Sequence, residues 1–170
     1  MSAEAQTEAT GARALLASTA AAVRTLWAPG RRARVFVARD PMRALELVPG
    51  GSPAPGLSVS LCWGGDAASD DDPENGPGNT ARGTLLCAVA QEASLKPRDE
   101  DDATAILEAA ESLRAFLLAL DLPSLTGRLV YGGMSPLDPY PGADRFAGYA
   151  LTFHTDYSYP SEEDPDAEED

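Results

Sequence analysis

The sequence is poor in the residues on which most catalytic and metal sites depend. It has two cysteines and one histidine in 170 residues, whereas a structural zinc site usually takes four Cys or His ligands. It contains no GxSxG, Walker, GxGxxG or HExxH motif, the marks of common hydrolases, nucleotide-binding proteins and zinc proteases. We therefore expect a protein that is not an enzyme, with no catalytic residue, metal ligand or cofactor.

Long apolar runs are missing as well. No run approaches the roughly 20 residues that a membrane-spanning helix needs. The first ten residues are polar and acidic, without the basic start and apolar centre of a secretory signal. These two features predict a soluble protein that has no membrane partner and is not exported by the usual route.

The two cysteines, Cys62 and Cys87, each lie inside a strand-like run. Small buried thiols of this kind are typical of a protein core, and we expect both to be reduced. A disulfide between them remains possible if the two strands pair.

Positive charge is scarce but concentrated. The net charge is -14, yet residues 1–43 hold seven arginines against three acids, while residues 44–170 hold six basic residues against 24 acids. Most acids fall in three clusters, at residues 66–74, 99–102 and 162–170. Charge runs often belong to solvated loops, but a chain with one basic patch and one acidic flank can also join copies of itself head to tail. Most of the surface should repel nucleic acid.

Two segments have the periodicity of amphipathic helices. The first covers residues 11–27, and the second follows the acid cluster, with Asp101 or Asp102 as its expected cap and Pro123 as its stop. The apolar stripe of the second helix consists of Ile106, Ala109, Ala110, Leu113, Leu117 and Leu120. Helices of this length need a packing partner to be stable.

Strand-like segments outnumber the helices. They are residues 33–40, 57–63, 84–95, 128–134 and 147–158, with one possible helical turn at 41–51. The segment at 84–95 is apolar on both faces and should be central, and the last one alternates between an apolar face and a polar face that carries His154. The order predicts an α+β fold: a mixed, mostly antiparallel sheet of about five strands with two helices packed on one face.

The domain boundaries follow from composition. We expect a disordered N-terminus at residues 1–10, a single domain at 11–160 and an acidic tail at 161–170. Within the domain, residues 64–83 are mostly Gly, Asp, Asn and Pro and should form a long acidic loop.

The C-terminal half carries a resemblance to a known family. The stretch "LVYGGMSPLDPYPG" followed by "AGYALTFHTDYS" resembles tail terminator, or tail completion, proteins of tailed phages and phage-like particles. In those proteins a Y-x-G-M-x-P-L segment leads through a proline-rich loop into a Y-x-L-x-F strand. The matching positions here are Tyr131, Gly133, Met134, Pro136, Leu137, Tyr149, Leu151 and Phe153. The resemblance covers residues 104–158, and it does not extend to the acidic loop or tail.

This resemblance implies a structural virion protein that forms a ring with copies of itself, six-fold in that family. The ring would cap the tail tube, end tail polymerisation and offer a docking face to a neck, connector or sheath protein, with DNA only passing through the channel. The location would be the virion tail or a phage-like particle, assembled in the host cytoplasm.

The residues that suit such contacts are apolar or arginine. Prolines in the connector between the last two strands, residues 131–142, would reduce the entropy lost on docking. Arginine forms forked hydrogen bonds to carboxylates. The expected interface residues are Met134, Pro136, Leu137, Tyr140, Arg31, Arg32 and Arg34. The connector could instead fold back over its own sheet.

Three alternatives remain open. The chain could be a neck or head-tail connector subunit, or an acidic mimic or regulator that binds basic proteins through its acid clusters. An enzyme is the third alternative, for which Ser135 and His154 are the only candidates.

Overall fold

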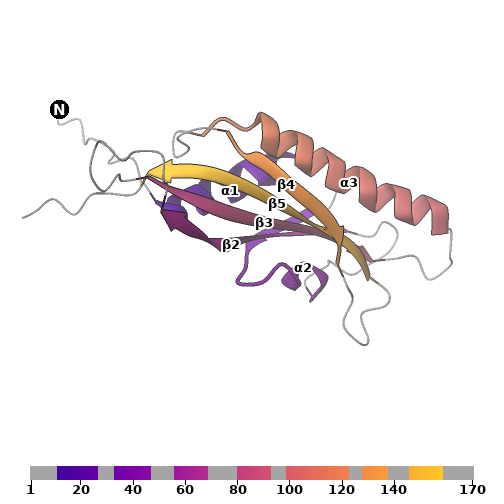
Figure 1. The fold of residues 1–170 in the computed structure, drawn as a ribbon. Coiled ribbons are helices and arrows are strands. Elements are labelled where there is room, and N and C mark those ends of the chain that lie inside the picture. The colour runs from indigo at the N-terminus through magenta and orange to yellow at the C-terminus, as the bar shows by residue number, and fades with distance from the viewer. Residues whose placement is uncertain are drawn as a thin grey trace, which may run out of the picture.

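The computed structural model describes residues 11–26, 33–46, 56–68, 80–92, 99–122, 128–137 and 146–158. They form an α+β fold in which helices pack on a five-stranded sheet (Figure 1). The helices are α1 (Ala12–Leu26), α2 (Arg43–Glu46) and α3 (Asp99–Ala119). The strands are β1 (Ala33–Val37), β2 (Leu57–Ala68), β3 (Thr80–Glu92), β4 (Val130–Pro136) and β5 (Phe146–Ser158).

The sheet has the strand order β1-β2-β3-β5-β4. β1 pairs with β2 in parallel, and the other three pairings are antiparallel. The predicted fold class is therefore confirmed, as is the central position of the strand that is apolar on both faces, which is β3. Two different strands, β1 and β4, form the edges of this sheet.

The main core lies between one face of the sheet and the two long helices. Leu113 and Leu117 of α3 and Val23 of α1 are fully buried against that face. The sheet contributes a layer of alternate residues, among them Val59 of β2 and Phe153 of β5. Both predicted helices thus cover one face, because each has a single apolar stripe to bury.

The short helix α2 lies on the opposite face of the sheet (Figure 1). Ala44 packs with Ala88 and Ala90 of β3, and the Ser60 hydroxyl donates a hydrogen bond of 3.0 Å to the carbonyl oxygen of Pro41. Among the described residues, no other helix covers this face. We call it the open face.

The strands of the first hairpin are longer than predicted. Residues 64–68 and 80–83, expected in the acidic loop, belong to β2 and β3. Gly64 is the extra residue of a β-bulge, and Gly65 has a φ of +107°. The glycine-rich sequence predicts a loop, but here it forms a bulge after which the strand pairing continues.

The second helix also begins earlier than predicted. α3 starts at Asp99, so Asp101 and Asp102 lie within its first turn rather than at its cap. Carboxylates in this turn interact favourably with the helix dipole, and this position suits them as well as the cap does.

The possible disulfide is ruled out by the register. Cys62 pairs with Leu86 and Cys87 pairs with Leu61, so the two thiols project from opposite faces of the sheet. Both cysteines are free and buried, as expected.

Two further findings concern the described residues only. None of the helices formed by them has the length and apolar character that crossing a membrane requires. Nor do they bring together three His, Cys, Asp or Glu side chains that could hold a metal ion.

Candidate interaction surfaces

The two halves of the phage-tail motif are brought together as a strand pair. β4 carries the first half and β5 the second, and they run antiparallel at one edge of the sheet. The motif residues that pair across the two strands are Tyr131 with Phe153, Met134 with Leu151, and Pro136 with Tyr149. Residues separated by 13 to 22 positions in the sequence therefore form one structural unit.

Much of this motif is engaged in packing within the chain. The rings of Tyr131 and Phe153 lie 5.8 Å apart between centroids, and the guanidinium of Arg114 from α3 lies 5.4 Å above the Tyr131 ring. Such ring and cation contacts fix β4 and β5 beneath α3. The motif thus accounts for how this edge of the sheet is held to the helix.

The predicted interface residues occupy different environments. Met134 is half-buried against the main core, and Leu137, only 8% exposed, packs on the open face with Ala88 and Ala90. Pro136 and Arg34 are exposed. The remaining three, Tyr140, Arg31 and Arg32, lie outside the described residues. At the described start of the connector, Leu137 therefore folds back over its own sheet, while Ser135 and Pro136 remain exposed.

The edge strand β4 is poorly suited to pair with another strand. Its ladder is interrupted by a bulge between Tyr131 and Gly133. The amide of Leu137 donates to Gly148 of β5, so the backbone of the preceding Pro136 points outward, where proline has no N–H to offer. Bulges and edge prolines are common protections against unwanted sheet extension. Contacts at this edge would thus use side chains.

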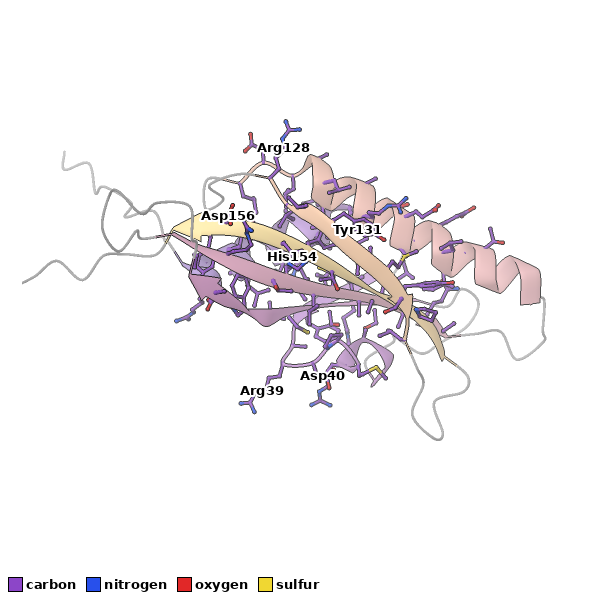
Figure 2. The ribbon with its side chains drawn as sticks, in the orientation of Figure 1. Arg39, Asp40, Arg128, Tyr131, His154 and Asp156 are labelled. Carbon is purple, nitrogen blue, oxygen red and sulfur yellow. The ribbon has the colours of Figure 1, made fainter. Side chains whose placement is uncertain are left out.

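A row of polar side chains crosses the part of the open face that α2 leaves uncovered. Arg82 of β3 donates from Nε to Asp156 of β5 over 3.1 Å. In the next register pair on this face, Thr84 Oγ1 and His154 Nδ1 lie 3.3 Å apart and share a hydrogen bond. Figure 2 shows His154 and Asp156 projecting from β5 away from α1 and α3.

This row borders a groove of about 360 Å³. Its wall includes Arg128 and Val130 at the start of β4, and Val130 is 62% exposed. Asp156, which is paired with Arg82, also lines the groove. The sequence did not reveal this groove, because Arg82 lay in the expected loop and Val130 appeared as an ordinary strand residue.

Ser135 and His154, the candidate nucleophile and base, do not lie together on the open face. Ser135 pairs with Ala150, while His154 lies four residues further along β5. Four residues of a strand span about 13 Å, well beyond hydrogen-bond reach. His154 instead contacts Thr84, and Ser135 is exposed near the other end of β4.

The opposite edge of the sheet is basic. A groove of about 370 Å³ runs along the end of β1, with Phe36, Val37 and Ala38 as its apolar part and Arg39 and Arg43 beside them. Figure 2 shows Arg39 at the end of a connection that leaves the body of the sheet. We call the surface formed by Arg34, Val37 and Arg39 the basic edge.

Opposite charges are separated across the molecule. α1 packs over β1 and β2, and the described residues 11–46 hold five arginines against two acids. α3 packs over β3, β5 and β4, and the described residues 99–137 hold seven acids against two arginines. Among the acids of this region whose side chains the structure describes, Glu108, Glu111 and Asp121 are exposed, so the exposed acids of α3 lie over the half of the sheet that is distant from β1.

Comparison with known proteins adds no relative. No protein-family model matches the chain, and a search of curated proteins finds no match.

Proposed function

We propose that this chain is a tail terminator: a structural subunit, without catalytic activity, that forms a ring on the end of a phage-like tail tube and stops its growth. The partners would be further copies of itself, the tube protein beneath, and a neck, connector or sheath protein above. DNA would only pass through the channel, and the protein would be located in the virion tail or in a phage-like particle.

The observation that carries the proposal is the pairing of the two motif halves. A motif that resembles terminator proteins in the sequence consists of residues that are register partners in β4 and β5. The same residues also hold α3 in place through Tyr131 and Arg114.

The charge separation supports the proposal independently. A ring requires two different surfaces on each subunit, one for each neighbour. The basic α1–β1 side and the acidic outer face of α3 are two such surfaces. Negative charge on a channel wall would also let DNA slide without adhering.

The test is electron microscopy of particles produced with and without this chain. A terminator predicts tails of abnormal, variable length when the chain is missing, and normal length when it is supplied again. Tails of uniform normal length without the chain would contradict the proposal.

The same images separate the alternatives. A neck or connector subunit predicts normal tails that fail to join heads. An enzyme predicts that His154→Ala or Ser135→Ala abolishes function, whereas a terminator retains normal tails with either variant. An acidic regulator predicts no change in tail length and a partner whose binding is lost at high salt.

A further inference from the structure

We propose that the basic edge of one copy contacts the outer face of α3 in the next copy, through arginine–glutamate pairs. This inference rests on the proposed ring and assigns the two surfaces that would join its subunits. The occupant of the β1 groove is thus a second copy of this chain.

The basic edge exposes two arginine side chains and one valine side chain. Arg34 and Arg39 are exposed, and neither forms an ion pair with a described carboxylate. Val37 is 49% exposed and lines the groove with Arg39. Arg34 projects from the other face of the same edge strand, because side chains alternate along β1. The nearest acid, Asp40, already accepts a hydrogen bond of 2.8 Å from the amide of Met42, which ties it to the turn before α2.

The backbone of this edge is partly blocked against strand addition. Arg24 of α1 donates to the carbonyl oxygen of Val35 over 3.4 Å. The amide of Ala38 points inward to Leu61 of β2, so by alternation Val35 and Val37 are the residues whose backbone groups face outward. Because the Val35 carbonyl already accepts from Arg24, a partner strand could form fewer backbone hydrogen bonds at this edge. A partner is therefore better recognised by side chains.

The outer face of α3 offers the complementary set. Glu108, Glu111 and Ala115 lie on the side of the helix opposite its buried leucines, and all three are exposed. Glu108 has no ion pair with a described residue, and Glu111 has only a long contact of 3.9 Å with Arg114. Glutamates three positions apart are neighbours on a helix surface, and Ala115 allows close approach of an apolar side chain such as Val37.

A second copy fits this groove better than an unrelated partner does. The chain that carries the basic edge also carries the acidic helix, on the other half of the sheet. Because the two surfaces differ, the contact is heterologous and leaves one of each free for the next copy, as a ring requires.

Charge reversal tests the assignment in the full-length chain. The basic-edge variant is Arg34→Glu with Arg39→Glu, the acidic-helix variant is Glu108→Arg with Glu111→Arg, and a third variant combines all four. The control is Arg13→Glu, compared with Arg34→Glu alone, because both make the same charge change at one exposed arginine and Arg13 lies outside both surfaces. Circular dichroism and thermal unfolding establish that each variant folds.

The readout is self-association, measured by sedimentation velocity in low salt and by the number of copies retained on isolated tail tubes. We expect each reversal alone to weaken association at least tenfold, the combined variant to recover most of it, and the control to match the unaltered chain. Association of the single reversals at the unaltered level, or no recovery in the combined variant, would overturn the inference.

The failure of this contact and the failure of the proposed function give different results. If the reversal variants still produce tails of normal length, the subunits join through other surfaces and the terminator role stands. If tails are normal without the chain while the reversals still disrupt self-association, the contact stands and the terminator role does not.

Discussion

His154 lies against Gly132 of the neighbouring edge strand, so closely that a Cβ atom at position 132 would come 2.8 Å from His154 Nε2. On its other side the imidazole shares a hydrogen bond with Thr84. The ring is thus held between β3 and β4 on the open face. The bulge that begins at Gly132 is what creates this space.

Two glycines of the sheet should respond differently to replacement by alanine. At Gly148 a Cβ would come 2.6 Å from the carbonyl oxygen of Val89, a backbone atom of the central strand that cannot move aside. Gly148→Ala should therefore lower the free energy of unfolding by about 2–3 kcal/mol. At Gly132 the obstacle is the far end of the His154 side chain, so Gly132→Ala should cost less than about 1 kcal/mol. Urea unfolding of both variants measures this difference, and equal costs would mean that the Val89 carbonyl moves aside as readily as the His154 ring.

Two serines on the same face of β2 form a second matched pair. Ser58 is fully buried, and its hydroxyl has no hydrogen-bond partner among the described residues, whereas Ser60 donates to Pro41. A buried hydroxyl without a partner is destabilising, and removing it relieves that cost. Ser58→Ala should leave the free energy of unfolding unchanged or raise it by about 1 kcal/mol, while Ser60→Ala should lower it by about 1 kcal/mol. A larger loss at Ser58 would mean that its hydroxyl has a partner.

The buried thiols should make the protein sensitive to alkali. Burial and, to a smaller extent, the negative charge of Asp40 together raise the pKa of Cys62 from 9.0 to about 11. Burial also raises the pKa of Cys87, beyond that of Cys62. Because the folded state holds the protonated thiol, this contribution to stability is complete below pH 9 and is lost as the pH rises through about 11.

Chemical denaturation at a series of pH values measures this effect. We expect stability to decline from about pH 9 upward, and Cys62→Ala to decline less steeply over the same range. A thiol reagent at pH 8 should react slowly with the folded chain and rapidly once it is denatured, because the thiolate is the reactive form. Rapid reaction of both thiols in the folded chain would contradict their burial.

The sequence predicted those helices and strands in which apolar residues repeat with the period of a helix or of a strand. The alternation in β5 and the leucine stripe of α3 each identify a buried face, so the fold class and the helix-covered face followed from them. Pairing between distant strands has no such local signal. The parallel β1–β2 pair and the order β1-β2-β3-β5-β4 could therefore come only from the structure.

The interface residues were harder to predict for a related reason. Apolar residues in a connector suit a docking surface and an inward fold equally well, and only the tertiary contacts of Leu137 distinguish the two. The open-face groove depends on Arg82, which becomes a strand residue only because β2 and β3 continue past the Gly64 bulge. A glycine-rich sequence does not indicate whether two strands stop pairing there or continue to pair beyond a bulge.

Tyr157 contacts the part of β2 in which pairing with β3 continues beyond the Gly64 bulge. Its ring meets Trp63 edge to face, with centroids 5.2 Å apart, and its hydroxyl donates to the carboxylate of Asp66 in the extended part of β2. Tyr157→Phe keeps the ring contact and removes the hydrogen bond, so it should lower the free energy of unfolding by about 1 kcal/mol.

The control is Tyr149→Phe on the same strand, because the Tyr149 hydroxyl has no hydrogen-bond partner among the described residues. It should leave stability within about 0.5 kcal/mol of the unaltered chain. Hydrogen exchange gives the local readout: in Tyr157→Phe the amides of residues 65–68 should exchange faster, while those of residues 57–61 should not change. Unchanged exchange at residues 65–68 would mean that Tyr157 does not hold the end of the hairpin, and that the glycines alone set where the pairing stops.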